Sequence, residues 1–256
     1  MKALDVTGLS KGFGGVQAVD NLSFSVDEHE AVGIIGPNGA GKTTVFNLIT
    51  GQYRPDAGRV EFFGKDITNI KPFHPVSLGI ARTFQNIRLF KGLTVLKNVL
   101  VPILVRIGYG PLGAVFESKR YAKAEKAAAE KAMTLLDFFR LSPKADLLAS
   151  SLPYGEQRRL ELARALAADP RLLLIDEPGA GMNPREIRDL LGDIREVKKT
   201  FGLTILIIEH QMGLVMNLSD RLVVLDFGEK IAEGTPAEIR KDRHVIEAYL
   251  GEDFPC

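Results

Sequence analysis

The chain has 256 residues, of which 45% are hydrophobic and 25% charged, and this ordinary globular balance excludes a disordered or collagen-like protein. Its 33 basic and 32 acidic residues leave a net charge of +1, which argues against a broad nucleic-acid-binding surface. The single cysteine, Cys256, excludes a disulfide framework and a zinc cluster built from cysteines.

The first third of the chain predicts strands around a glycine-rich turn. Residues 22–26 alternate between apolar and polar side chains, which is typical of a strand with one buried face. Residues 31–35 form a continuous apolar run of buried-strand length that ends at Gly36, and a helix is expected over residues 42–50. A short strand over residues 60–63 follows.

Between about residues 87 and 152 the sequence pattern is typical of helices, and beyond residue 152 it again indicates alternating strands and helices. Residues 119–139 are rich in Ala, Lys and Glu, with apolar residues at helical spacing, which indicates an amphipathic helix packed on its own subdomain. Beyond residue 152 we expect helices and apolar strands over 156–168, 172–175, 186–201 and 203–208, then a hairpin over 221–225 and 230–231. Apolar strands that alternate with helices predict a covered parallel sheet, so the fold class is α/β with a helical insert.

A phosphate-binding loop is predicted directly after the strand at residues 31–35. The residues that carry it are Gly36, Pro37, Asn38, Gly39, Ala40, Gly41, Lys42, Thr43 and Thr44. The glycines let successive backbone N–H groups curl round a phosphate, and the start of the following helix adds its positive end. Lys42 would reach the β- and γ-phosphates, and the Thr43 hydroxyl would ligate Mg²⁺.

Two carboxylates end the next buried strand. Residues 172–175 deliver Asp176 and Glu177 to a strand end, where ligands bind in open α/β sheets. An aspartate there can hold Mg²⁺ through a water, and the adjacent glutamate can orient and polarise an attacking water. A strand that ends in Asp-Glu is common by itself, but the phosphate loop upstream favours phosphoryl transfer.

Three weaker features narrow the class. Gln85 lies where the α/β part meets the helical insert, and His210 ends an apolar strand. The sequence Leu-Pro-Tyr-Gly-Glu-Gln-Arg-Arg over residues 152–159 opens a helix shortly before the carboxylate strand. A lone histidine or glutamine is more often structural, but the order and spacing of all five features together leave little room for chance.

The five features resemble the nucleotide-binding subunit of an ATP-binding-cassette (ABC) transporter over nearly the whole chain. The resemblance implies ATP and Mg²⁺ as cofactors, Phe13 as the ring that stacks on adenine, and Gln85 as a ligand of the metal or its water. It implies that the catalytic residues are Glu177, His210 and Lys42, and that the metal site is formed by Thr43, Gln85 and Asp176. The signature segment, which this family presents across a dimer to the γ-phosphate held by the other subunit, comprises Pro153, Tyr154, Gly155 and Glu156.

The resemblance also implies the architecture of a P-loop NTPase. We expect a RecA-like parallel sheet core with an antiparallel β subdomain, interrupted by an α-helical subdomain. The whole chain, 1–256, would be a single ATPase domain with its catalytic core at 1–86 and 155–235, its helical subdomain at 87–154 and a C-terminal helical tail at 236–256.

Two positions depart from the general family pattern. Pro153 replaces a serine and removes both a hydroxyl and a backbone donor, so the γ-phosphate should depend more on the Gly155 N–H and the helix N-terminus. Asn183 stands where an aspartate is usual, which puts in doubt any contact across the dimer that needs a carboxylate there. Neither departure touches the catalytic residues, and we expect hydrolysis to be intact.

Several stretches resemble the G-type ATPase of branched-chain amino acid importers. They are residues 36–51, 82–90, 153–161 and 248–251, together with a longer helical insert over 108–131. That type pairs with a related second ATPase, two integral-membrane permeases and a periplasmic or extracellular substrate-binding protein. We therefore expect a peripheral ATPase at the cytoplasmic face of the membrane, because no run reaches the roughly 18 apolar residues of a membrane span and the N-terminus lacks a secretory signal.

Other functions stay open at this point. ATPases of urea or amide importers and of lipopolysaccharide export carry similar motifs, and whether the dimer is of identical or related chains is undecided. A DNA-repair or translation factor of the same fold is less favoured without long coiled coils or tandem cassettes, and a GTPase lacks its guanine-reading N-K-x-D motif. An inactive scaffold is disfavoured by the intact catalytic residues. The apolar residues Ile87, Leu89 and Phe90 are expected either to be exposed in a groove that receives a permease helix or to pack the subdomain.

Overall fold

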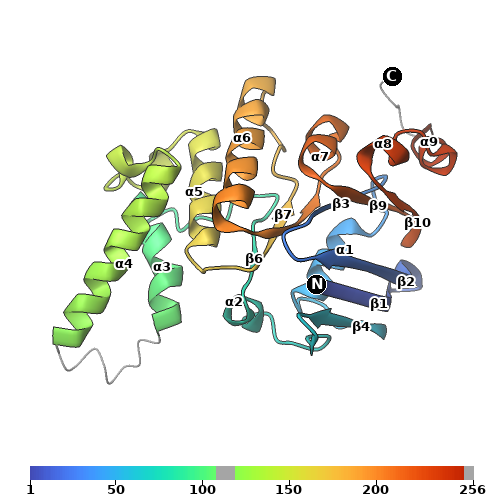
Figure 1. Cartoon of the computed structure of the whole chain (residues 1–256), viewed down its shortest axis with the longest axis horizontal. Coiled ribbons are helices and arrows are strands. Elements are labelled where there is room, and N and C mark those ends of the chain that lie inside the picture. The colour runs from blue at the N-terminus through green and yellow to red at the C-terminus, as the bar shows by residue number, and fades with distance from the viewer. Residues whose placement is uncertain (108–118, 251–256) are drawn as a thin grey trace. The chain divides into compact units, whose positions relative to one another are not determined.

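The computed structural model describes residues 1–107 and 119–250, so Cys256 and part of the expected longer insert lie outside the described residues. The chain divides into two compact units. The first combines Met1–Ile80 with Arg171–Cys256, and the second is the continuous stretch Ala81–Pro170. The first unit is thus built from both ends of the chain (Figure 1).

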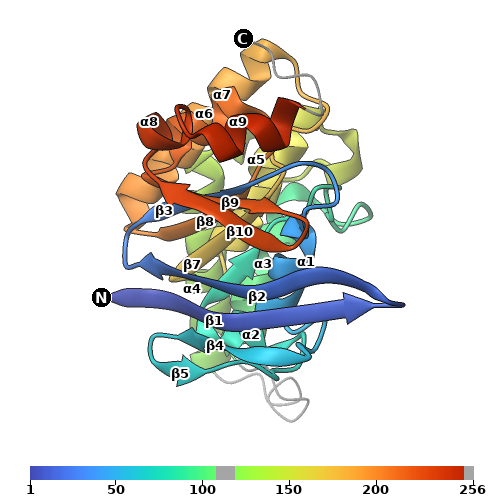
Figure 2. The same ribbon diagram turned by 90° about the vertical axis from the view of Figure 1, so that its right-hand side faces the viewer.

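A four-stranded antiparallel sheet forms one layer of the first unit, in the order β2-β1-β4-β5. Its strands are β1 (Lys2–Phe13), β2 (Val16–Asp27), β4 (Ala57–Phe62) and β5 (Lys65–Asp66). Buried positions alternate with more exposed ones along much of β2, as expected for a strand with one face on the core. In Figure 2, β1 and β2 run side by side across the unit.

A six-stranded sheet forms the other layer, in the order β10-β9-β3-β8-β7-β6. Its strands are β3 (Ala31–Ile35), β6 (Ile80–Arg82), β7 (Leu172–Asp176), β8 (Thr204–Ile208), β9 (Arg221–Asp226) and β10 (Glu229–Gly234). β3, β7, β8 and β9 run parallel, and β10 returns antiparallel to β9 as the predicted hairpin. Every residue of β3, β7 and β8 is buried, because a parallel strand inside an α/β unit has both faces covered.

The helices of the first unit follow the strands in the alternation that the sequence predicts. They are α1 (Lys42–Ile49), α2 (His74–Leu78), α6 (Pro184–Phe201), α7 (Met212–Leu218), α8 (Pro236–Ile239) and α9 (Arg243–Leu250). α8 and α9 contact β10, and Figure 2 shows them beside the β9–β10 hairpin. The C-terminal helices therefore belong to the same unit as the phosphate loop.

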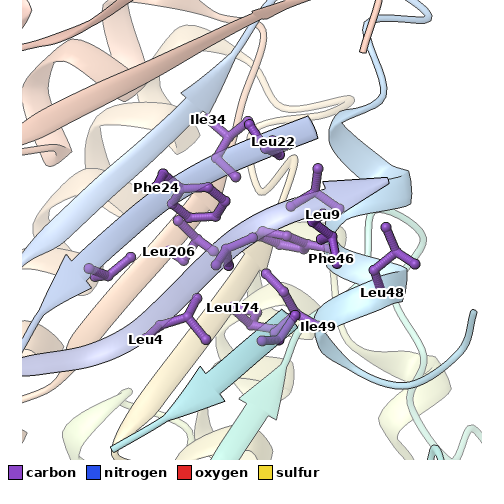
Figure 3. Close-up of a cluster of buried hydrophobic side chains, with 14 of the residues drawn as sticks. Leu4, Leu9, Leu22, Phe24, Ile34, Phe46, Leu48, Ile49, Leu174 and Leu206 are labelled. Carbon is purple, nitrogen blue, oxygen red and sulfur yellow. The ribbon is translucent and has the colours of Figure 1, made fainter. Parts of the chain in front are cut away.

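The two sheets share one hydrophobic core. Figure 3 shows the side chains of β1 and β2 meeting those of α1 and of the six-stranded sheet. Members of this cluster are Leu4, Leu9, Phe24, Ile34, Phe46, Leu174 and Leu206, each at most 4% exposed. Burial of apolar surface stabilises at about 25 cal/mol per Å², so this cluster anchors the strands that carry the site loops.

The second unit is mainly helical. Its helices are α3 (Val95–Ile107), α4 (Lys119–Phe138) and α5 (Tyr154–Leu166), with two short 3₁₀ turns at Ser142–Lys144 and Ala149–Ser151. On the α4 side, Ala128, Leu135 and Phe139 are buried, as the amphipathic pattern predicts. Of the three apolar residues that follow Gln85, Phe90 is exposed, whereas Ile87 and Leu89 are half-buried.

Candidate functional site

Three parallel strands of the first unit end at the same level. In the ladder, Ile34 of β3 lies opposite Ile208 of β8, and Ile208 lies opposite Asp176 of β7. The loops that follow these strands start with Gly36, Glu177 and Glu209. The phosphate loop, the paired carboxylates and the histidine therefore leave the sheet at one edge, where ligands bind in α/β proteins.

The loop from β3 to α1 is folded for close backbone approach. Gly41 has φ +96°, and a Cβ atom there would lie 2.2 Å from the carbonyl oxygen of Ala18. Gly36 is equally confined, since its Cβ would lie 2.1 Å from the carbonyl oxygen of Leu225. Only glycine fits both positions.

Lys42 is the first residue of α1, and its side chain turns back over the loop. It is 7% exposed, and its Nζ donates hydrogen bonds to the carbonyl oxygens of Gly36 at 2.7 Å and Pro37 at 2.8 Å. A buried ammonium needs such partners, because leaving a charge unpaired in the interior is very costly. The loop thus holds a positive charge at the helix N-terminus, which is an arrangement that favours a phosphate.

Asp176 and Glu177 leave β7 in different environments. Asp176 is 4% exposed at the end of the strand, whereas the side chain of Glu177 is 17% exposed. Glu177 has φ +42°, an uncommon conformation for a residue with a side chain, and its N–H donates to the carbonyl oxygen of Ile208 at 2.8 Å. This bond ties the turn after β7 to the neighbouring strand β8.

His210 follows β8 and faces two carboxylates. Its Nδ1 lies 3.6 Å from Oε2 of Glu177 and 3.5 Å from Oε1 of Glu209. The structure therefore brings the predicted catalytic pair, Glu177 and His210, close together from adjacent strands. The His210 side chain is half exposed, so the pair is open to a ligand.

Glu209 is a residue that the motif analysis missed. It is fully buried, and its carboxylate accepts hydrogen bonds from the backbone N–H groups of Gly179, His210 and Gln211, at 3.2, 3.0 and 3.0 Å. The Gln211 side chain completes the clamp by donating to the carbonyl oxygen of Gly179 at 3.3 Å. The sequence did place an acidic residue directly after an apolar strand. The motif analysis, however, assigned a role only to the histidine that follows it.

Phe13 lies at the end of β1, in the same unit. Its ring is 42% exposed and contacts Tyr53 edge to face, with the ring centroids 5.1 Å apart. Lys11 approaches the ring, its Nζ 5.5 Å from the centroid. An exposed ring fixed by neighbours can offer a face for stacking.

A cavity of about 630 Å³ adjoins the phosphate loop in this unit. It is lined by Pro37 and His210 and by residues of α7 and of the C-terminal helices, among them Met216, Ile239 and Tyr249. The sequence interpretation gave these C-terminal residues no place near the site.

The other predicted site residues lie in the second unit. Gln85 is exposed, and its carbonyl oxygen accepts a hydrogen bond from Arg158 at 2.9 Å. Pro153 precedes α5 as its N-cap, and Tyr154 begins the helix with 41% of its surface exposed. The opening turn of a helix leaves its first backbone amides without intrahelical acceptors, so the Gly155 and Glu156 amides suit an anion.

Glu156 has a second partner that the motif alone did not indicate. Both of its carboxylate oxygens accept hydrogen bonds from Lys144 Nζ at 2.6 Å. Since a carboxylate in the first helical turn would repel an anion, this ion pair offsets its charge.

Comparison with known proteins places this chain in one family. A family model described as "ABC transporter" matches residues 19–180, which is more than half of the chain. The chain belongs to the ABC transporter family. A second model, described as "Branched-chain amino acid ATP-binding cassette transporter", matches residues 229–255 of this ABC transporter protein.

Relatives match this ABC transporter ATPase along nearly its whole length. It is 44% identical over 250 residues to the high-affinity branched-chain amino acid transport ATP-binding protein BraF of Pseudomonas aeruginosa, covering 97% of this chain and 98% of the relative. It is 42% identical to LivG of Escherichia coli, covering 97% and 98%, and 40% identical to a probable LivG of Methanocaldococcus jannaschii, covering 98% of each.

Solved ABC cassettes share its fold. The ADP conformation of one ATP-binding cassette of an ABC transporter aligns with TM-score 0.85 and 39% identity, covering 98% of this chain and all of that one. A nucleotide-free cassette aligns with TM-score 0.83 at the same identity and the same share of this chain. The predicted P-loop NTPase fold is confirmed.

Membership in the family establishes the chemistry of this ABC ATPase. The protein binds ATP, uses Mg²⁺ and hydrolyses ATP in a reaction coupled to transport, and it acts as a dimer with membrane permeases. The residues present fit these cofactors, since the loop is shaped by confined glycines, holds a buried ammonium and lies at the strand edge that also presents Asp176. No helix in the described part of the chain has the length and apolar character that a membrane span requires.

Proposed function

We propose that this chain powers uptake of branched-chain amino acids from the cytoplasmic face of the membrane, where it is peripherally attached to two permeases. The observation that carries the substrate class is the match of residues 229–255 to a model of branched-chain amino acid cassettes. The names of the BraF and LivG relatives support it. The proposed partners are a second ATPase and, indirectly, a periplasmic or extracellular substrate-binding protein.

We also propose roles for the site residues. The residues of the phosphate loop, Gly36, Pro37, Asn38, Gly39, Ala40, Gly41, Lys42, Thr43 and Thr44, would bind the phosphates of ATP. Thr43, Gln85 and Asp176 would hold Mg²⁺, which supplies charge neutralisation for the phosphates when bound. Phe13 would stack on adenine, and Pro153, Tyr154, Gly155 and Glu156 would face the γ-phosphate held by the other subunit.

The proposed hydrolysis uses the pair that the structure brings together. Glu177 would take a proton from the attacking water, and His210, 3.6 Å away, would hold Glu177 and the γ-phosphate in line. Lys42 would move from the loop carbonyls to the phosphates, so that its ammonium keeps partners throughout. The proposed domain is single, with the segments 1–86 and 155–235 as its core, 87–154 as its helical subdomain and 236–256 as its tail.

The test of this function is purification of the membrane complex from its native host, with identification of the copurifying subunits and measurement of leucine, isoleucine and valine uptake in a strain that lacks the chain. We expect two permeases and a second ATPase, and uptake restored by the wild-type gene but not by Lys42→Ala. Copurification with urea-type or lipopolysaccharide-export permeases, or unimpaired uptake in the deletion strain, would contradict the substrate assignment and leave the ATPase chemistry intact.

A further inference from the structure

The second unit contains a fully buried ion pair that the motifs do not explain. Arg158 and Glu161 lie one turn apart on α5, each with 1% of its side chain exposed, and Arg158 Nη1 donates to Glu161 Oε2 at 2.7 Å. Burying two charges costs several kcal/mol for each ion, and an apolar pair of similar volume often gives equal or greater stability. The groups that these two charged side chains contact should therefore explain why a charged pair is buried here.

Both members of the pair form hydrogen bonds with one segment, residues 84–88. Arg158 donates from Nη1 to the carbonyl oxygen of Phe84 at 2.8 Å and from Nη2 to that of Gln85 at 2.9 Å. Glu161 Oε1 accepts from the backbone N–H of Arg88 at 3.2 Å and of Phe84 at 3.5 Å. Donor and acceptor groups on both sides of Gln85 are thus held by two side chains of α5.

The outer side of the segment is fixed as well. The guanidinium of Arg88 lies 4.1 Å from the centroid of the Phe84 ring, and that of Arg82 lies 5.0 Å from it. Burial raises the pKa of Glu161, and the charge of Arg158 and the Arg88 amide oppose that rise. The buried pair and the segment therefore stabilise one another through their hydrogen bonds.

The same pair reaches the start of α5. Arg158 Nη2 lies 3.5 Å from the hydroxyl of Tyr154, the first residue of that helix. Because an α-helix is stiff over one turn, a displacement of residues 84–88 must carry the helix N-terminus with it as long as the ion pair holds. We propose that Arg158 and Glu161 are positioning residues that make the Gln85 segment and the signature end of α5 move as one body. This inference rests on the proposed function, in which both ends contact nucleotide.

The double variant Arg158→Met with Glu161→Gln tests the coupling and removes both charges of the pair together. Arg158→Lys is the conservative variant, because one ammonium keeps the charge but cannot present the planar fork that spans two carbonyls and a carboxylate. The matched control is Lys126→Met with Glu130→Gln, which removes an exposed pair on α4 whose atoms are 3.9 Å apart.

The measurements use the assembled transporter in proteoliposomes. For the double variant we expect ATP turnover stimulated by transported substrate to fall at least about tenfold, because small misplacement of a positioned group lowers kcat strongly. The apparent KM for ATP should stay within about threefold, since the phosphate loop is untouched. Hydrogen exchange at the Phe84 and Arg88 amides should speed up at least about tenfold, since their acceptor is weakened. For Arg158→Lys, we expect stimulated turnover and amide exchange rates between those of the wild type and the double variant. The control variant should match the wild type in both measurements.

Three results would overturn the inference. The first is full stimulated turnover in the double variant while the two amides exchange faster. Residues 84–88 would then be released from α5 without any effect on ATP turnover. The second is loss of turnover in proportion to loss of folded protein in both the double variant and Arg158→Lys, which would make the pair merely structural. The third is a wild-type transporter without ATP turnover, which would remove the proposed function and this inference together, whereas the first two leave that function standing.

Discussion

Two glycines of the phosphate loop differ in what surrounds them, although both have positive φ. Gly41 has its would-be Cβ 2.2 Å from a backbone oxygen, whereas Gly39, at φ +83°, has open space within 4 Å. We expect Gly41→Ala to destabilise the fold by more than Gly39→Ala, which should cost only the conformational strain of about 1–2 kcal/mol. Urea unfolding of both variants measures the difference, and equal losses would contradict the crowding at Gly41.

Glu177 is the residue on which the proposed hydrolysis depends. Glu177→Gln keeps the shape of the side chain but cannot take a proton, so we expect ATP to bind normally while turnover falls by at least about 100-fold. Turnover within about threefold of wild type, measured by phosphate release, would show that another group acts as the base.

Glu209 allows a test of the hydrogen bonds that its buried carboxylate accepts beside the proposed catalytic pair, Glu177 and His210. Its two oxygens accept N–H groups on both sides, so Glu209→Gln must turn an NH₂ group toward a backbone donor. We expect this buried mismatch to cost about 1–3 kcal/mol of stability and to lower kcat. Glu229→Gln on the exposed start of β10 is the control, and an unchanged kcat in Glu209→Gln would remove Glu209 from the site.

At the scale of elements, α6 shows what a departure from the family pattern does. Asn183 is its N-cap, with a side chain that accepts from the N–H groups of Arg185 and Glu186 in a capping box. Asn183→Ala should cost about 1 kcal/mol in unfolding free energy, whereas Asn183→Asp should stay close to wild type because aspartate caps equally well. A thermal melt of the three proteins decides this, and equal melting of Ala and Asp variants would contradict the cap.

The elements were predictable where one physical rule dominates. The buried strands at β3, β7 and β8 follow from apolar runs of strand length, and the start of α1 follows from the glycines before Lys42. Helix α5 was placed, but its buried charges were not, because Arg158 and Glu161 look like a solvated helix face in the sequence. Residues 84–88 form hydrogen bonds with Arg158 in the folded unit, and tertiary contacts of that kind leave no local pattern in the sequence.

At the scale of the whole molecule, nucleotide binding should show as stabilisation. A ligand at 100 times its Kd adds about 2.7 kcal/mol to the unfolding free energy of a state that binds it. We expect ATP with Mg²⁺ to raise the melting temperature of the wild type, chelation of the metal to remove most of the rise, and Lys42→Ala to remove it entirely. A full shift in Lys42→Ala would contradict the role of the buried ammonium.

The sequence pattern predicted that the chain divides into an α/β part and a helical part. It predicted only partly which segments pack together within each unit. The helical stretch after Gln85 predicted an insert, and strands that alternate with helices predicted an α/β core. The neighbours of Phe13 and the helices α8 and α9 beside the phosphate loop depend on packing between distant segments. No spacing rule connects Pro37 to Tyr249, which is why the C-terminal part of the site was missed.

The pairing of β3 with β8 and β9 has a consequence for synthesis of the protein. The ribosome makes the strand that carries the phosphate loop early, but its neighbours begin at Thr204 and Arg221. At about 5–20 residues per second, β3 waits roughly 10–30 s for its first partner strand in the sheet, β8. During that interval the second unit, which is continuous in the chain, can fold on the ribosome, while an apolar strand stays without its ladder. Nascent chains released before residue 204 therefore carry the nucleotide motif after a strand that lacks both of its neighbours in the six-stranded sheet, and they expose this apolar segment to the quality-control machinery of the cell.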